Sequence, residues 1–420
     1  MLWLINHFAC RFCSTLSVAF REIERRNLRR RHRSDIVLSK NRHENTLLRF
    51  LVISPETIMA SLSAFQDQFP TLYADKEKEL GGTPTTDPNF HYVIRKAWIL
   101  EWARNSYAKL IGWPDKPYDV IANGLENGEV YDISPTSLPG YFAKDAFLSA
   151  NPAKKPTVID SAYAYKGTAG YKENYWVDFA NIRLGGGAFV NGLAQEETMV
   201  LESPELANAV ASPNDYITRR PSDGDGVGVR QGCPRPLVVY GVNHVIHLTE
   251  PSPKPADRYW WTALDKDELR KYVVDLTKDT CGRNFNVLAM AAPDLRRHVG
   301  GKTFTGKEIE VIQDLFNTFV AGFVKATGHE PQVNVPADQK FMIHTGGIGT
   351  GIFGNDKVVV YVLQCLAAQH VGGADLTFYM VDAATVESGR KAYEEILGLL
   401  KKDTKIEEML NTAREVLARY

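Results

Sequence analysis

From about residue 155 onward, short β-rich runs alternate with amphipathic helical segments, and this alternation constrains the fold of the 420-residue chain most strongly. Runs of β-branched and aromatic residues indicate strands, and apolar residues at three- and four-residue spacing indicate helices that cover them. Strands that alternate with helices predict an α/β sandwich. The candidate strands are residues 157–159, 175–179, 237–240, 245–248, 287–290, 341–344 and 376–381.

Several of the helical segments have readable ends. Thr305-Gly-Lys-Glu308 matches a capping box and precedes an apolar stripe that runs from Ile309 to Phe323. Two charged amphipathic helices are expected at the end of the chain, over residues 387–401 and 404–419. Upstream, Asp87-Pro88 indicates a helix start, and Trp98 and Trp102 follow with a core-facing spacing.

The chain divides by composition into three parts. Residues 1–58 form a basic extension with a run of arginines, residues 59–150 a mainly helical accessory region, and residues 151–420 the α/β domain. The basic start is compatible with an organelle transit peptide, a nuclear-import patch, or an upstream extension of a protein that begins at Met59. We expect an intracellular protein of the nucleus or cytoplasm, with the mitochondrion as the alternative.

The overall charge and the cysteines narrow the classes of partner. A formal net charge of −1, with 24% charged residues, argues against a whole-surface commitment to nucleic acid or to acidic lipid. Five scattered cysteines do not form a disulfide framework, and no second pair accompanies Cys10 and Cys13 at zinc-finger spacing. We expect a monomer that makes no contact with a membrane and no sequence-specific contact with nucleic acid.

The first segment that carries chemistry runs from Asp178 to Glu197. It contains three consecutive glycines, Gly185, Gly186 and Gly187, and after seven further residues the sequence Gln195-Glu196-Glu197. Glycines permit positive φ and remove every Cβ, so the backbone can lie against a ligand with its N–H groups directed inward. The composition alone is also compatible with a glycine turn followed by a solvated acidic segment.

The pair Glu196 and Glu197 supplies the acid and base that glycoside cleavage requires. Adjacent residues point to opposite faces of an extended chain, so at most one of the two reaches the reacting atom directly. One carboxyl group must stay protonated near neutral pH to donate to the leaving oxygen, and burial beside a second carboxylate favours that state.

The second segment follows the candidate strand 341–344 and contains Gly346, Gly347, Gly349, Gly351 and Gly354 before an apolar helix. A glycine loop that enters a helix N-terminus is typical of an anion site, and a diphosphate fits it. The spacing Gly349-x-Gly351-x-x-Gly354 also meets the dinucleotide fingerprint, with Asp375 near the offset of a ribose-binding acid. Too few strands follow this loop for a dinucleotide-binding domain.

His244 and His247 are the other residues that suggest a ligand. On a strand their three-residue spacing places them on opposite faces, which is unsuitable for a shared metal. The remaining acidic residues and histidines have no convincing ligand spacing. We therefore expect neither a metal nor a cofactor.

The complete string from Val177 to Glu197 closely resembles the signature of the poly(ADP-ribose) glycohydrolase family. The resemblance implies a macrodomain-like three-layer α/β/α sandwich with a mixed central sheet and an N-terminal helical extension. It makes Glu197 the general acid, Glu196 and Asn181 ligands of the scissile ribose, and Gln195 and Asp178 their supports. It makes Gly185–Gly187 the loop that cradles the ribose. By the same resemblance the diphosphate of ADP-ribose contacts Gly349, Thr350, Gly351, Ile352, Phe353, Gly354 and Asn355.

After the signature, residues 198–201 are expected to continue as a short strand, and Ser203-Pro204 to open a helix. Two positions depart from the family pattern: Asn355 replaces a glycine, and Met380 replaces an aromatic residue that packs on adenosine. The adenine-contacting tyrosine has no clear equivalent, although Tyr259, Trp260 and Trp261 are candidates for an aromatic wall.

The expected activity is hydrolysis of the ribose–ribose bonds of poly(ADP-ribose) with release of ADP-ribose. Its partners are then poly(ADP-ribose) or ADP-ribosylated proteins. A hydrolase of mono-ADP-ribosylated proteins and a non-catalytic ADP-ribose reader remain as alternatives.

Overall fold

The computed structural model describes residues 88–110, 155–188, 193–211, 218–220, 233–251, 260–277, 283–296, 304–328, 336, 339–401 and 404–420. All of them belong to the second of two compact units, Ile53–Tyr420. Within these ranges no helix has the length and apolar character needed to cross a membrane. The expected boundaries near residues 58 and 150 lie outside the described residues and stay predictions, as do the roles suggested for the arginine run, Cys10, Cys13 and Tyr259.

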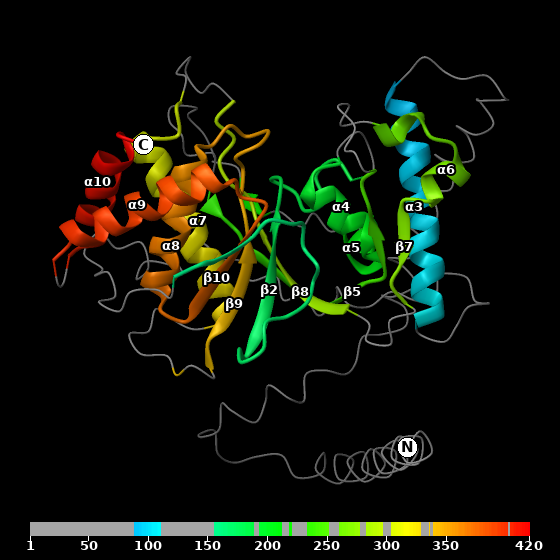
Figure 1. Ribbon diagram of the computed structural model, residues 1–420, viewed down its shortest axis with the longest axis horizontal. Helices are drawn as coiled ribbons and strands as arrows, with labels where there is room; N and C mark the ends of the chain where they lie inside the picture. The colour runs from blue at the N-terminus through cyan, green and yellow to red at the C-terminus, as the bar shows by residue number, and fades with distance from the viewer. Residues whose placement is uncertain are drawn as a thin grey trace, which may run out of the picture. The chain divides into compact units, whose positions relative to one another are not determined.

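A six-stranded sheet forms the centre of this unit, in the order β1-β10-β9-β2-β8-β5 (Figure 1). Every neighbouring pair is parallel except β5 and β8, so the sheet is mixed. Two further pairs of short strands lie outside this sheet. The central strands are β1 (Thr157–Ile159), β2 (Glu173–Phe179), β5 (Leu237–His244), β8 (Arg283–Met290), β9 (Phe341–Thr345) and β10 (Ala374–Tyr379), and the short pairs are β3 (Arg219–Arg220) with β4 (Cys233–Pro234) and β6 (Ile246–Leu248) with β7 (Val273–Asp275).

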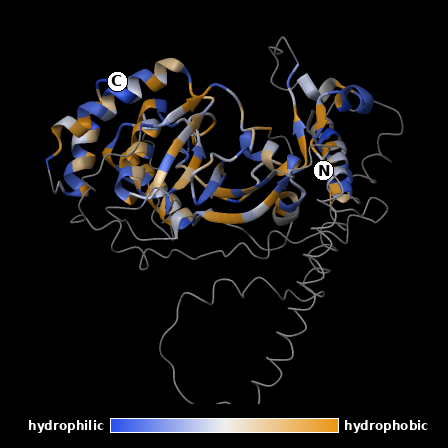
Figure 2. Ribbon diagram, turned by 60° about the horizontal axis from the view of Figure 1, so that its bottom comes forward, coloured by the Kyte–Doolittle hydropathy of each residue, from blue (hydrophilic) through white to orange (hydrophobic). Residues whose placement is uncertain are grey.

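Helices cover both faces of the sheet, and each face has its own apolar core. Alternate residues of β2 point to the two cores: Tyr175 and Val177 to one, Trp176 to the other. Figure 2 shows apolar residues concentrated along the strands and the helix faces that meet them. One face carries α7 (Ile309–Thr327), α8 (Lys357–Val371), α9 (Ala383–Leu399) and α10 (Ile406–Leu417), and the other α3 (Pro88–Leu110), α4 (Gln195–Glu202), α5 (Pro204–Ala211), η2 (Trp260–Ala263) and α6 (Lys266–Arg270).

The structure thus confirms a three-layer α/β/α sandwich around a mixed sheet. Six of the predicted runs overlap strands of the central sheet, whereas the seventh, residues 245–248, overlaps β6, which pairs with β7 in a separate ribbon.

Two predicted helix starts are wrong. α7 begins at Ile309 with Glu308 as its N-cap, because the Glu308 side chain accepts the N–H groups of Thr305 and Gly306 and holds a tight turn there. α9 begins at Ala383 rather than at residue 387, because Asp382 caps it by accepting the N–H of Thr385.

Candidate active site

The two glycine segments leave the sheet at the same edge. β2 and β9 are adjacent and parallel, so the loops that follow Phe179 and Thr345 start side by side. The second loop also lies close to the end of β2, because a Cβ added to Gly346 would lie 2.9 Å from the Phe179 ring. The fold therefore brings together the two segments that the sequence singles out.

The segment after the first glycine loop is a helix, so the predicted strand at residues 198–201 is wrong. α4 starts at Gln195, after Ala194 as its N-cap, and ends at Glu202, with Ser203 as its C-cap. Glu197 Oε2 accepts the N–H of Ala194 at 2.7 Å, which pairs a donor that a helix N-terminus leaves open. Glu196 and Glu197 consequently do not point to opposite faces as they would on a strand.

Both carboxylates of the pair hold the glycine loop through its backbone. Glu196 accepts the N–H of Asn181 at 3.0 Å and that of Gly185 at 2.7 Å. Glu197 Oε1 accepts the N–H of Gly187 at 3.0 Å. The loop N–H groups were expected to point toward a ligand, but these three point toward the protein's own acidic side chains. Both carboxylates are buried, with 4% of Glu196 and 8% of Glu197 exposed.

Gly186 lies where the loop passes closest to the acidic pair. Its φ is +44°, and a Cβ at this position would lie 2.5 Å from Glu196 Oε2 and 2.9 Å from Glu197 Oε1. A side chain here would therefore displace both carboxylates as well as strain the backbone. This explains physically why the loop requires glycine at its centre.

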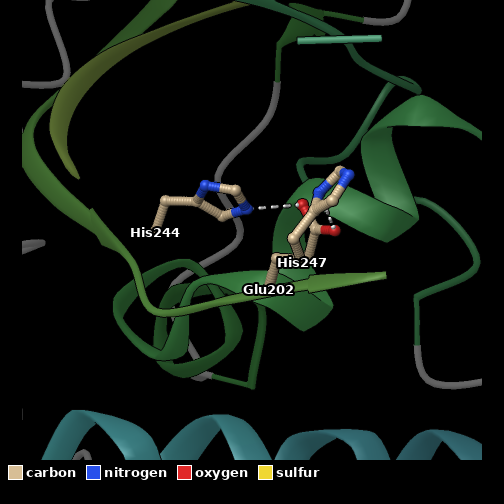
Figure 3. Close-up of side chains that lie close together, drawn as sticks. All are labelled: Glu202, His244 and His247. Atoms are coloured by element: carbon tan, nitrogen blue, oxygen red, sulfur yellow. Dashed lines mark hydrogen bonds and ion pairs between the residues drawn. The ribbon is translucent and has the colours of Figure 1, made fainter. Parts of the chain in front are cut away.

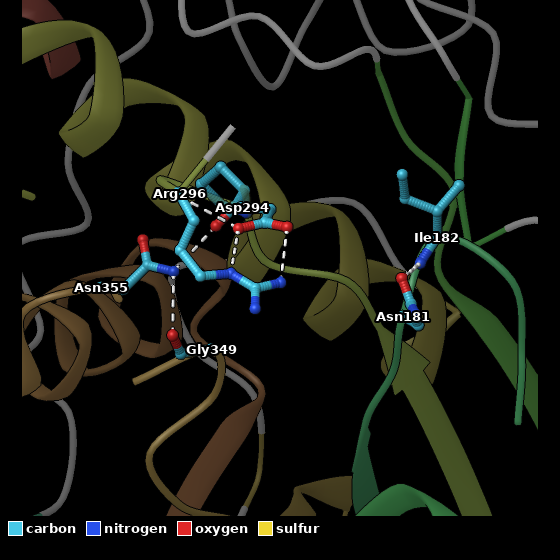
Figure 4. A network of polar contacts seen from close by, with 7 residues as sticks. Asn181, Ile182, Asp294, Arg296, Gly349 and Asn355 are labelled. Carbon is cyan, nitrogen blue, oxygen red and sulfur yellow. Dashed lines mark hydrogen bonds and ion pairs between the residues drawn. The ribbon is translucent and has the colours of Figure 1, made fainter. Parts of the chain in front are cut away.

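Gln195 and Asn181 lie on either side of the loop. The amide of Gln195 accepts the N–H of Phe179 at 2.9 Å and donates to the carbonyl of Val177 at 3.2 Å, which joins α4 to β2. Asn181 Oδ1 accepts the N–H of Ile182 at 2.7 Å (Figure 4). Gln195 thus supports the acidic pair through the main chain of the central strand, while Asn181 shapes the loop itself.

Asp178 lies beneath the acidic pair on β2. It is 1% exposed, and neither carboxyl oxygen has a hydrogen-bond partner among the described residues. Burial, together with the charge of Glu197, raises the pKa of Asp178 to about 8. Burial and the carboxylates of Asp178 and Glu197 also raise the pKa of Glu196, against the hydrogen bonds from Asn181 and Gly185. Burial therefore favours the protonated form of both Asp178 and Glu196.

Asp178 makes stability depend on pH. The pKa of Asp178 is about 8 in the folded state, above the ordinary value of 3.8. Its contribution to the free energy of unfolding is therefore fully present below pH 3.8 and is lost as the pH rises toward 8. For Asp178→Asn we expect the difference in free energy of unfolding between about pH 5 and pH 9 to shrink by a few kcal/mol. Urea unfolding at the two pH values measures it. An unchanged difference would show that Asp178 ionises as freely in the folded state as in the unfolded chain.

The second glycine loop is held by Asn355. Its Nδ2 donates to the carbonyls of Pro293 at 2.8 Å and Gly349 at 3.1 Å (Figure 4), and the side chain is buried. Gly349 has φ +68°, and a Cβ there would lie 2.6 Å from Ala292 Cβ. The amide of Asn355 is therefore committed to the loop, and its predicted contact with substrate stays untested.

The N-terminus of α8 already carries a negative group. Asp356 Oδ1 accepts the N–H groups of Val358 and Val359 at 2.9 and 3.0 Å. A free helix N-terminus was expected to receive the anion, and this capping carboxylate corrects that expectation. The loop remains available, since among the described residues the N–H groups of Gly349, Gly351, Ile352 and Phe353 donate to no backbone carbonyl.

Arg296 adds a cation beside this loop that the sequence does not reveal. It follows β8 and forms a bidentate ion pair with Asp294, in which Nε and Nη2 donate to the two carboxylate oxygens at 2.9 Å. Its guanidinium carbon lies 5.7 Å from the centre of the Phe353 ring. Its side chain is 55% exposed, so it can also meet a solvent-borne anion. Leu295, next to it, donates its N–H to the carbonyl of Phe353 at 2.9 Å and fixes the two segments together.

A hollow opens on the other side of the second loop, toward β10 and α9. It is lined by Gly346, Gly347, Thr350, Tyr361, Met380 and Asp382, among others. Met380 has φ +53° and is 66% exposed, so a large apolar side chain stands at the rim in a conformation that non-glycine residues rarely adopt. This is the position where the family pattern has an aromatic residue.

The dinucleotide interpretation of the second loop is wrong. Only one strand, β10, follows the loop in the described sheet. Asp375 pairs with Met342 at the amino end of β10, opposite the edge where the loop leaves β9. It accepts hydrogen bonds from Tyr171 and Lys340 there, too far along the strand to reach a ribose held by the loop.

His244 and His247 lie together, against the expectation from strand spacing. β5 ends at His244 and β6 begins at Ile246, so the chain turns between them. His244 Nε2 lies 3.0 Å from one Glu202 oxygen and His247 Nδ1 lies 3.1 Å from the other (Figure 3). Burial opposes ionisation of Glu202, but the hydrogen bonds from the two histidines outweigh it and lower its pKa to about 2.

These three side chains offer donor atoms within 4.8 Å of one another, which is a suitable set for a metal ion. His244 Nδ1, however, is buried and has no partner among the described residues, whereas a metal-bound imidazole usually donates from its second nitrogen. We therefore interpret the cluster as a hydrogen-bonded anchor for the C-terminal end of α4. The expectation of no metal stays a prediction.

Lys96 is a second cation that the sequence analysis missed. It lies on α3, is fully buried, and donates from Nζ to the carbonyl of Gly187 at 2.8 Å. A signal was available: Ile99, Leu100 and Ala103 follow it at the spacing of one buried helix face. A lysine on such a face indicates a specific acceptor, since burying an unpaired ammonium group is costly.

The chain was compared with known protein families, curated proteins and solved structures. No family model matches the sequence, and no curated protein matches it. The poly(ADP-ribose) glycohydrolase of Thermomonospora curvata is 16% identical, with a TM-score of 0.38 over 71% of this chain and 98% of that one. Its complex with the inhibitor ADP-HPD is 15% identical, with a TM-score of 0.39 over the same shares.

The poly(ADP-ribose) glycohydrolase of Deinococcus radiodurans, in complex with ADP-ribose, is 16% identical. Its TM-score is 0.32, over 53% of this chain and 76% of that one. Because these TM-scores lie below 0.5, the function proposed next rests on the residues of the site.

Proposed function

We propose that this protein is a glycoside hydrolase that cleaves the ribose–ribose bonds of poly(ADP-ribose) and releases ADP-ribose. The observation that carries the proposal is the buried acidic pair Glu196 and Glu197, held against the glycine loop at the carboxyl edge of the sheet. Glycoside hydrolysis needs a carboxyl group that gives a proton and takes it back, beside a second acidic group. The resemblance of residues 178–197 to the glycohydrolase signature specifies the sugar.

In this mechanism Glu197 donates its proton to the leaving ribose oxygen while positive charge develops on the sugar. The resulting carboxylate then takes a proton from the attacking water. Each carboxylate oxygen of Glu197 accepts one backbone N–H. An oxygen has room for two hydrogen bonds, so each keeps a site for substrate or water. Glu196, the second acidic group, contacts the ribose hydroxyls.

The second glycine loop receives the diphosphate of ADP-ribose. Its open N–H groups at Gly349, Gly351, Ile352 and Phe353 supply hydrogen bonds without a countercharge. Arg296 supplies the positive charge at the edge of the same loop. An anion bound there would lie near the acidic pair, because the two loops leave adjacent parallel strands.

The test is incubation of the purified full chain with labelled poly(ADP-ribose) and, separately, with a mono-ADP-ribosylated protein, following free ADP-ribose. We expect release from the polymer. Release from the mono-modified protein alone would move the function to a mono-ADP-ribosyl-protein hydrolase. Saturable ADP-ribose binding with no release from either substrate over hours would identify a reader.

A further inference from the structure

Lys96 reaches the glycine loop from α3, a helix of the accessory region. Its ammonium group is fully buried and donates to the carbonyl of Gly187 at 2.8 Å. α3 packs on α4, the helix that begins with the acidic pair. The loop is thus held from a part of the chain that lies outside residues 151–420.

Lys96 and Glu197 bind the same residue of the loop. Gly187 accepts from Lys96 through its carbonyl and donates to Glu197 Oε1 through its N–H at 3.0 Å. Glu197 Oε2 is bound in turn by the N–H of Ala194 at the start of α4. The position of the Glu197 carboxyl group therefore depends on where Gly187 lies, and Lys96 fixes one side of Gly187.

The two groups also interact through their charges. Burial lowers the pKa of Lys96 to about 7, and the charge of Glu197 opposes that fall. Most of the other charged groups on the elements that pack on α3 have hydrogen-bond or ion-pair partners of their own. These pairs are Glu196 with Asn181 and Gly185, Glu202 with His244 and His247, Glu205 with Asn243, Asp275 with Thr277, and Lys266 with Glu101. Further charged groups nearby are Asp178 on β2, Asp265 before α6, and Asp267, Glu268 and Arg270 on α6.

We propose that Lys96 is a positioning residue of the active site, whose ammonium group holds Gly187 and thereby sets the Glu197 carboxyl group in place for proton transfer. The inference rests on the proposed function. It makes α3 a necessary part of the catalytic centre. Displacement of a reacting group by about 1 Å can cost on the order of a hundredfold in rate, so loss of this contact acts on turnover.

The kinetic test compares Lys96→Met and Lys96→Arg with Lys109→Met. Lys109 lies on the same helix, but its side chain is 59% exposed and pairs with Asp275 at 3.7 Å. For Lys96→Met we expect kcat on poly(ADP-ribose) to fall about tenfold to a hundredfold, with KM within a few fold of wild type. Lys96→Arg should recover part of kcat because it restores a cationic donor, and Lys109→Met should match wild type.

A kcat for Lys96→Met within twofold of wild type, or an equal loss in Lys96→Met and Lys96→Arg at unchanged melting temperature, would overturn the proposal. If Lys96→Met does not fold, the proposal is tested by the kcat of Lys96→Arg and by the titration of Lys96 described next.

The second measurement does not require turnover. NMR of protein labelled with ¹³C at lysine Cε gives a signal for Lys96, which is assigned by its absence in a Lys96 variant. In the wild type we expect the titration midpoint of this signal near pH 7. In Glu197→Gln this midpoint should fall, because the negative charge that favours the ammonium form is gone. A midpoint that does not move would overturn the inference. The wild type could prove inactive while the Lys96 midpoint still falls in Glu197→Gln. That outcome would reject the proposed function but would support the interaction between Lys96 and Glu197.

Discussion

Glu197→Gln is expected to lower kcat for release of ADP-ribose by about 10²- to 10⁴-fold. Glutamine has nearly the same shape but cannot give a proton to the leaving oxygen or take one from water. Glu196 still holds the glycine loop through Asn181 and Gly185, so the affinity for free ADP-ribose should stay within a few fold. Steady-state kinetics on poly(ADP-ribose) and calorimetric titration with ADP-ribose measure the two quantities.

Glu196→Gln is the matched control for this variant. Glu196 is the adjacent residue on α4, is similarly buried, and likewise accepts two backbone N–H groups. An amide in either position can accept only one of the two N–H groups, so both variants lose a similar amount of stability. A larger loss of kcat in Glu197→Gln at a matched melting temperature assigns proton transfer to Glu197. Wild-type turnover in Glu197→Gln would remove Glu197 from the mechanism.

Gly186→Ala is the second variant for which we expect a large effect. Its Cβ would enter the space held by Glu196 Oε2 at 2.5 Å and Glu197 Oε1 at 2.9 Å, so both carboxyl groups must move. We expect kcat to fall by about a hundredfold and stability to fall by roughly 1–2 kcal/mol from the left-handed backbone alone. Kinetics and thermal unfolding measure the two losses separately.

Gly170→Ala separates backbone strain from displacement of the carboxylates. Gly170 has φ +87°, and nothing lies within 4 Å of an added Cβ. The control should therefore lose a similar amount of stability and keep its kcat. If Gly186→Ala were as active as Gly170→Ala, the loop would have room for a side chain, and the close approach to the acidic pair would not matter for catalysis.

Local sequence patterns predicted most of the sheet. The predicted runs at residues 175–179, 287–290 and 341–344, which lie in β2, β8 and β9, are mostly apolar, because central strands covered on both faces bury most of their side chains. The side-by-side position of the two glycine loops, in contrast, depends on the pairing of β2 with β9, which are far apart along the chain. The prediction failed where local signals competed. Residues 198–201 were predicted as a strand, but the N-terminal hydrogen bond from Ala194 to Glu197 and packing on β2 make them part of a helix.

The structure shows how the predicted active-site residues are arranged, and their catalytic and binding roles stay predictions. Spacing selected Glu196, Glu197 and the glycines, yet the hydrogen bonds from loop to carboxylates depend on α4 starting at Gln195. Likewise, the turn between His244 and Ile246 brings two histidines to Glu202, although strand spacing separates them.

The sequence by itself determined the alternation of strands and helices, the acidic pair and the glycines that the loops need, because these depend on residue type and short spacing. Only the tertiary structure decided which groups face that pair. Lys96 and Gly187 are 91 positions apart, and Asp178 meets the pair across the interface of β2 and α4. Burial and distance between such groups set their charges, and neither quantity exists until the chain has folded.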